Sequence, residues 1–120
     1  MLNVKLYGYK KEDAYLLRDK VDECMRQAGL SGKGVTTYCS SEVRVCGGGG
    51  RVMPYLELQS SNLDYFLPIL NKFRLLGVFE NVQVMGMGVY EFLSADDMKN
   101  SYFIELSEQI VISERVFSRH

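Results

Sequence analysis

A run of four glycines, residues 47–50, separates two stretches in which apolar and polar residues alternate as they do in β-strands. We pair the two stretches as an antiparallel hairpin that closes on the glycines. The opposed pairs are then Cys46–Arg51, Val45–Val52, Val43–Pro54, Ser41–Leu56 and Cys39–Leu58. One face of the hairpin becomes mainly apolar. Because a slip of one residue would turn every apolar side chain outward, this match predicts both the hairpin and its register.

Two helices and two further strands are predicted on either side of this hairpin. Strands are expected where apolar and polar residues alternate, and helices where apolar residues recur at steps of three and four. The predicted segments are a strand over 2–7, a helix from 10 to Gly29, a helix from a capping box at 61–64 to Gly77, and a strand that starts at Val82 and can run past Gly86 and Gly88 to Phe92. Pro68 lies in the second helix and is expected to bend it or delay its start.

The order strand, helix, strand, strand, helix, strand predicts a ferredoxin-like βαββαβ domain of the α+β class over residues 1–93. Right-handed crossovers place both helices on one face of a single antiparallel sheet. Residues 94–120 form a C-terminal extension, predicted to be a short helix capped by Ser94 and followed by extended structure. An extension this apolar is expected to pack on the sheet of its own domain or on a neighbouring subunit.

The sheet face that the helices leave open is predicted to be rich in tyrosine and methionine. Alternate positions along the strands assign to it Tyr7, Tyr9, Tyr38, Met53, Tyr55, Met85 and Met87. A large exposed apolar patch on a soluble protein usually marks an interface. We therefore predict a homo-oligomer, a dimer or a trimer, packed sheet to sheet. The alternative is that the C-terminal extension covers this face within its own subunit.

Composition narrows the classes of partner and the cellular compartment. The 120 residues carry a net charge of −1, which gives no electrostatic reason to expect nucleic acid or an anionic membrane as a partner. No apolar run is long enough to span a membrane. The three cysteines are an odd number at irregular spacing, which is not a disulfide framework and predicts a reducing, cytoplasmic setting.

Few side chains in the sequence can support catalysis or metal binding. The single histidine is His120, the last residue, so neither a Ser-His-Asp triad nor a histidine zinc site is expected. Cys39 and Cys46 lie seven residues apart, which is not a metal-ligand spacing. Cys46 is expected beside Arg44 and Arg51, where its thiol is either reactive or an incidental surface group. No catalytic residue and no metal ligand is therefore predicted, and no particular cofactor is indicated.

Positive charge and glycine backbone meet at the predicted hairpin tip. Glycines expose backbone N–H groups that can line an anion pocket. The candidate ligand contacts are Lys33, Arg44, Gly47, Gly48, Gly49, Gly50 and Arg51. The glycines lead into a strand rather than a helix and lack the ending of a P-loop, so a flexible hairpin tip is the alternative interpretation.

The run RQAGLSGKGV, from Arg26 to Val35, resembles the end of the first helix and the second strand in PII-like signalling proteins. The segment FLPIL at 66–70 is similar to the second helix of some members, and with the strand order the resemblance covers residues 2–92. It implies a trimer whose ligands bind in clefts between subunits. It also implies that the loop between the second and third strands, here the glycine hairpin, senses the ligand or contacts a partner. The basic turn that binds nucleotide phosphates in the nitrogen regulators is not visible at 76–81.

The sequence therefore predicts a PII-like regulatory or small-ligand-binding oligomer without catalysis, whose partner is a small anionic ligand or a regulated protein. Two other classes stay open. A single-stranded RNA-binding module has the same strand order and would stack bases on Tyr7 and Tyr55, although 51–56 lack the usual aromatic-glycine pattern. A small-molecule enzyme of the dimeric ferredoxin-like type would form a pocket on the sheet face, with the polar groups of Tyr7, Tyr38, Tyr55 and Arg44.

Overall fold

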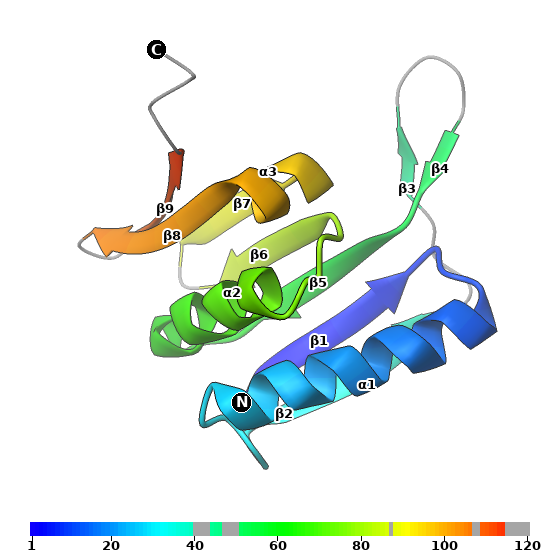
Figure 1. The fold of residues 1–120 in the computed structure, drawn as a ribbon, viewed down its shortest axis with the longest axis horizontal. Helices are drawn as coiled ribbons and strands as arrows, with labels where there is room; N and C mark the ends of the chain where they lie inside the picture. The colour runs from blue at the N-terminus through cyan, green and yellow to red at the C-terminus, as the bar shows by residue number, and fades with distance from the viewer. Residues whose placement is uncertain (40–43, 47–50, 87, 107–108, 115–120) are drawn as a thin grey trace.

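A five-stranded sheet forms the centre of the fold in the computed structural model, which describes residues 1–39, 44–46, 51–86, 88–106 and 109–114 (Figure 1). The strand order is β2-β1-β5-β6-β7. These strands are β1 (Leu2–Tyr7), β2 (Gly34–Cys39), β5 (Tyr55–Gln59), β6 (Val82–Gly86) and β7 (Val89–Leu93). The helices are α1 (Lys11–Gln27), α2 (Phe66–Leu75) and α3 (Ala95–Asn100). Two further antiparallel pairs are β3 (Arg44–Cys46) with β4 (Arg51–Met53) and β8 (Ser101–Leu106) with β9 (Gln109–Glu114).

The core lies between the sheet and the two longer helices, which pack against each other on one face of the sheet (Figure 1). Alternate residues of the central strands, such as Val4, Leu58 and Val84, point to this face and are fully buried. The apolar stripe predicted for α1 is Ala14, Leu17, Val21, Cys24 and Ala28; the first four are buried, and Ala28 packs partly buried against the core. The matching stripe of α2 consists of Phe66, Ile69, Leu70 and Phe73. The helix-covered face is therefore the apolar interior of the protein.

The α+β class is confirmed, but the strand order differs from the ferredoxin-like order that the succession of elements predicts. β1 pairs in parallel with β2, and β5 pairs in parallel with β6, whereas β1 and β5 are antiparallel. Each of the two longer helices therefore connects two strands that are neighbours in the sheet. In the ferredoxin-like fold, a third strand lies between the two strands that a helix connects. β7 adds a strand antiparallel to β6. The sheet is consequently mixed, not wholly antiparallel.

The glycine hairpin is shorter than its sequence pattern predicts. β3 and β4 pair in the expected register, with Val45 opposite Val52. The predicted continuation is wrong, because Cys39 pairs with Tyr7 and not with Leu58. β1 lies between β2 and β5. These two strands therefore do not pair with each other, and each of them pairs with β1 instead.

The predicted last strand is two strands joined by a turn. β6 ends at Gly86, and the chain reverses into β7, with Val82 opposite Leu93. Gly86 has a φ of +148°, and a Cβ there would overlap the carbonyl oxygen of Ser60. The close backbone approach at this point requires glycine.

The second helix starts after a short 3-10 turn, η1 (Leu63–Tyr65). The cap of this turn is Asn62 and not Ser61 as predicted, because the Asn62 side chain accepts the backbone N–H of Asp64 at 3.0 Å. α2 itself begins two residues before Pro68, which agrees with the expected delay of the helix.

The C-terminal extension begins as predicted. Ser94 and Asp97 form a reciprocal capping box at the start of α3. Met98 of α3 and Phe103 of β8 join the buried core, and β8 packs against α2. The described part of the extension therefore enlarges the core on the helix side. Within the described residues, no helix is long and apolar enough to cross a membrane.

Candidate functional site

The connection between β1 and α1 determines the geometry of the candidate site. Gly8 follows β1 with a φ of +79°, a left-handed conformation that glycine adopts without strain. A Cβ there would lie 3.1 Å from the Cα of Pro54, so the chain also passes close to the start of β5. The turn interrupts the strand alternation, and Tyr9 packs against the core on the helix side. The predicted position of Tyr9 on the open sheet face is therefore wrong.

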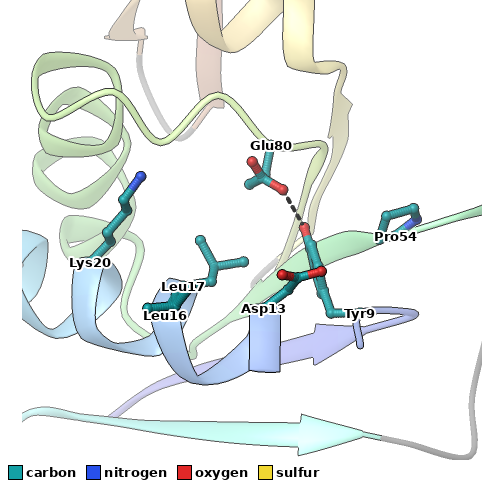
Figure 2. A pocket seen from close by; sticks show the side chains of 7 residues that line it. All are labelled: Tyr9, Asp13, Leu16, Leu17, Lys20, Pro54 and Glu80. Atoms are coloured by element: carbon teal, nitrogen blue, oxygen red, sulfur yellow. Dashed lines mark hydrogen bonds between the residues drawn. The ribbon is translucent and has the colours of Figure 1, made fainter. Parts of the chain in front are cut away.

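Tyr9 lines a cleft between α1 and the loop that precedes β6 (Figure 2). The cleft has a volume of about 370 Å³. Its other lining residues are Asp13, Leu16, Leu17 and Lys20 from α1, Glu80 from the loop and Pro54 from the segment before β5. Two carboxylates and one ammonium group face an apolar floor, so the cleft carries one excess negative charge.

A hydrogen bond fixes the Tyr9 side chain in this cleft. The Tyr9 hydroxyl donates to Oε1 of Glu80 at 2.9 Å (Figure 2). Burial raises the pKa of Tyr9 far above its usual value, and the negative charge of Glu80 and the hydrogen bond to it raise this pKa further. Tyr9 is therefore a neutral donor at physiological pH. The bond ties the start of α1 to the loop before β6, 71 residues further along the chain.

Tyr38 lies beside the same connection, on the helix side of the sheet. It pairs with Leu6, a core residue of β1, and neighbouring residues in a sheet point to the same face. Its predicted position on the open face is therefore wrong. The Tyr38 hydroxyl donates to the backbone carbonyl of Tyr9 at 3.1 Å. Together with the bond from Tyr9 to Glu80, this contact forms a chain of hydrogen bonds from β2 to the loop before β6.

A second, smaller pocket lies between α1 and β2, on the other side of the helix. It has a volume of about 130 Å³ and is lined by Leu6, Lys11, Ala14, Tyr15, Arg18, Thr36 and Tyr38. Nζ of Lys11 lies 6.0 Å from the centre of the Tyr15 ring, and Cζ of Arg18 lies 5.3 Å from it. Oγ1 of Thr36 is buried and has no hydrogen-bond partner in the described part of the chain. This lining holds two cations and no carboxylate, so the pocket is positively charged.

The predicted ligand contacts do not all lie together. Lys33 is exposed at the start of β2, where its carbonyl accepts the N–H of Leu2 at 2.8 Å. Arg44 and Arg51 lie on β3 and β4, which follow the other end of the sheet, where β1 finishes at Tyr7. Lys33 is therefore separated from the two arginines by the length of β1. The glycines predicted to join them, Gly47, Gly48, Gly49 and Gly50, lie outside the described residues.

The open face of the sheet keeps only part of the predicted apolar surface. Tyr7 and Tyr55 are neighbours on it, with ring centres 4.9 Å apart, and the Tyr7 hydroxyl donates to Glu57 at 3.1 Å. Met85 also belongs to this face, opposite Gln59. The predicted position of Met53 is wrong, since β4 is not part of the five-stranded sheet. Met87 lies outside the described residues.

A buried amide lies in the middle of this open face. Gln83 of β6 is only 6% exposed and sits between Glu57 of β5 and Phe92 of β7. Its Nε2 donates to the sulfur of Met85 at 3.0 Å. Its Oε1 is buried without a hydrogen-bond partner among the described residues. A buried acceptor without a donor is uncommon in proteins and calls for an explanation.

The thiols and carboxylates do not assemble a reactive or metal-binding group in the described part of the chain. Cys24 and Cys39 are free cysteines. Burial raises the pKa of the Cys24 thiol to about 11, and the nearby Glu23 carboxylate adds to this effect, so Cys24 stays protonated. No group of three or more His, Cys, Asp or Glu side chains in the described residues could hold a metal ion. The Cys46 side chain lies outside what the structure describes.

No protein-family model matches the chain, and no curated protein matches it with significant similarity. Any functional conclusion therefore depends on the geometry of the pockets and of the sheet face.

Sequence reasoning missed the cleft at Tyr9 and the smaller pocket at Thr36, which lie beside α1. Lys11, Tyr15 and Arg18 stand at positions i, i+4 and i+7, a spacing that places them on one side of a helix and could have been noticed. That Tyr38 also lines the smaller pocket could not have been predicted without knowing the position of β2 in the sheet. The cleft depends on the turn at Gly8, which strand alternation does not predict.

Proposed function

We propose that this protein binds a small ligand and acts as a non-catalytic regulator, in the manner of the PII-like proteins that part of its sequence resembles. The observation that carries the proposal is the pair of pockets on the two sides of α1, which one chain of hydrogen bonds connects. Tyr38, beside the smaller pocket, donates to the Tyr9 backbone, and the Tyr9 side chain donates to Glu80 in the cleft. A ligand in either pocket therefore acts on groups that shape the other.

Tyr38 gives a ligand in the smaller pocket a direct means of action. A ligand that accepts a hydrogen bond from the Tyr38 hydroxyl competes with the Tyr9 carbonyl for that donor. Loss of this bond loosens the β1–α1 connection and, with it, the side chain that holds Glu80. Phe79, in the loop before β6, is 37% exposed. A regulated protein partner that binds this exposed side chain would bind differently when the loop moves.

We infer that the working form is a homo-oligomer, a dimer or a trimer, in which a second copy covers the open sheet face. Lys5 and Glu57 are neighbours on this face, and a two-fold-related copy can match each with its opposite charge.

The charge of the smaller pocket and the free thiols suggest a ligand class and a compartment. A small anionic ligand suits the positive charge of the smaller pocket, where Lys11 and Arg18 meet. We infer a cytoplasmic protein, because Cys24 and Cys39 are free thiols and thiols stay reduced there.

A thermal-shift screen against nucleotides, inorganic anions and divalent metals tests the ligand-binding function. A ligand that binds only the native state raises its melting temperature. Tyr9→Phe is expected to diminish that shift because it breaks the chain of hydrogen bonds at Glu80. Tyr90→Phe, at an exposed tyrosine of β7, is the matched control. No shift with any of these compounds, together with a clear shift on adding single-stranded RNA, would overturn the proposal.

Light scattering on the pure protein tests the assembly. We expect a dimer or trimer, and Lys5→Glu should shift it toward the monomer because, in the proposed interface, it would face Glu57 of a second copy with like charge. Lys99→Glu, at an exposed position on α3, should leave the mass unchanged. A strict monomer at all concentrations would contradict the assembly.

A further inference from the structure

We propose that the pocket between α1 and β2 binds a tetrahedral oxyanion, the phosphate or sulfate group of a small ligand. The inference rests on the proposed ligand-binding function and names the chemistry of one of its two pockets. Three independent features support it: two cations gathered on one aromatic ring, a buried hydroxyl without a partner, and the size of the cavity.

The cations are the first feature. Lys11 and Arg18 both lie against the Tyr15 ring, at 6.0 Å and 5.3 Å from its centre, which brings two positive charges to one small pocket. Lys11 makes no ion pair within the described residues. Arg18 contacts Asp19 at 3.3 Å, but both side chains are exposed, and a guanidinium group has five N–H donors to share. An anion bound in the pocket that both cations line offsets their positive charge and can accept hydrogen bonds from them.

The hydroxyl groups are the second feature. Thr36 lines the pocket from β2, and its buried Oγ1 makes no hydrogen bond to the described residues. Burial of a hydroxyl without a partner costs stability, and a rotation of the Thr36 side chain toward the cavity would let a bound oxyanion accept this hydrogen bond. The Tyr38 hydroxyl lies in the same lining and can turn from the Tyr9 carbonyl to the ligand. The pocket thus offers neutral donors beside its two cations.

The size of the cavity is the third feature. Its volume of about 130 Å³ corresponds to roughly four water molecules at about 30 Å³ each. This space is large enough for a phosphate or sulfate group. Because β2 is an edge strand of the sheet, the remainder of a larger ligand can leave the pocket beside it.

Isothermal titration with inorganic phosphate, sulfate and acetate at constant ionic strength tests the assignment. Phosphate and sulfate should bind saturably and more tightly than acetate, which has fewer acceptor oxygens. Arg18→Gln and Lys11→Gln should each weaken phosphate binding about tenfold or more, because each removes charge-assisted hydrogen bonds. Lys99→Gln, at an exposed lysine of α3, should leave the affinity unchanged. Equal binding of acetate, or phosphate affinity unaffected by the first two variants, would overturn the proposal.

Thr36→Val provides a second test, which distinguishes a contact between Thr36 and the ligand from a purely structural role of Thr36. This nearly isosteric change removes the unpartnered hydroxyl, so the ligand-free protein should melt at a higher temperature than the wild type. The same variant should bind phosphate more weakly, because it has lost a donor. A variant with unchanged phosphate affinity would count against a contact between Thr36 and the oxyanion.

Failure of this inference can be told apart from failure of the proposed function. If phosphate and sulfate do not bind while another compound gives a thermal shift that Tyr9→Phe diminishes, the oxyanion assignment is wrong and the ligand-binding function stands. If phosphate binds as described but Tyr9→Phe leaves its thermal shift unchanged, the anion site stands and the proposed coupling between the pockets is wrong.

Discussion

The two pockets beside α1 differ in size and in charge although one helix lines both. The cleft toward Glu80 has about 370 Å³ and holds more negative than positive charge, whereas the pocket toward β2 has about 130 Å³ and only cations among its charged lining. Asp13 and Lys20 face the first, and Lys11 and Arg18 face the second. The difference shows how a surface helix can give its two flanks different binding properties while its apolar stripe fills the core.

The two pockets also differ in what supports them. The floor of the cleft includes Leu17, which is 8% exposed and belongs to the core, and its wall is fixed by the turn at Gly8. The smaller pocket stands on the edge strand β2, where Thr36 has a buried hydroxyl without a partner in the described residues. We therefore expect substitutions at the cleft to change stability most, and substitutions at the smaller pocket to change binding most.

Leu17→Ala should have the largest effect on stability. It removes a buried side chain from the floor of the cleft, which typically costs about 2–4 kcal/mol of unfolding free energy. Leu16→Ala, at the rim of the same cleft, should change this free energy by no more than about 0.5 kcal/mol, since Leu16 is 66% exposed. Urea unfolding of both variants provides the measurement. Equal losses would mean that floor and rim do not differ as we infer.

Gly8→Ala should come next, with a loss of about 2–3 kcal/mol. A side chain at a φ of +79° is strained, and the new Cβ would also meet the Cα of Pro54 at 3.1 Å. Gly29→Ala is the matched control, because Gly29 has a φ of +75° and nothing within 4 Å of its added Cβ. It should lose only about 1–2 kcal/mol. Thermal or urea unfolding then isolates the contact with Pro54 as the difference between the two variants.

The same turn marks a limit of what the sequence could predict. Periodicity predicted β1, α1 and the buried stripe from Ala14 to Cys24, because these elements follow one repeat from end to end. It placed Tyr9 on the wrong face, because Gly8 rotates the chain by a left-handed turn that breaks the repeat. The position of Tyr9, and with it the cleft, therefore depends on one backbone conformation that no pattern of polarity encodes.

The strand order marks a second limit. Alternation in 34–39 and 55–59 predicts that each segment has one buried face, but it does not say which strand is the neighbour. β1 lies between them with Tyr7 opposite both Cys39 and Tyr55, so Cys39 shares the open face with Tyr7 and the neighbouring Tyr38 points to the helix side with Leu6. The error moved Tyr38 to the open face and hid the smaller pocket. In the described part of the hairpin, the predicted register is confirmed, with Val45 opposite Val52.

Raising the pH should lower the free energy of unfolding through Tyr9 in the cleft, by less than the substitutions at Leu17 and Gly8 do. The raised pKa means that folded Tyr9 keeps its proton at pH values where the unfolded chain has lost it. Its contribution is therefore full below about pH 10 and falls as the pH rises further, by at most about 1.4 kcal/mol per pH unit. Urea unfolding between about pH 9 and 11 should show this decline in the wild type, and a smaller one in Tyr9→Phe. Tyr90→Phe, at an exposed tyrosine, should decline as the wild type does.

The smallest effect should come from the bond that joins the two pockets. Tyr38→Phe removes a hydrogen bond to the Tyr9 carbonyl from a partly exposed side chain, which should cost about 0.5–1.5 kcal/mol. Combined with Tyr9→Phe in a double-mutant cycle, it should show a coupling energy of about 0.5 kcal/mol or more, because both bonds hold the same residue in place. Tyr90→Phe combined with Tyr9→Phe should be additive, since Tyr90 is exposed on β7 and lines neither pocket. Additive losses for Tyr38 as well would mean that the two flanks of α1 respond independently, and a ligand on one side would then have no route to the other.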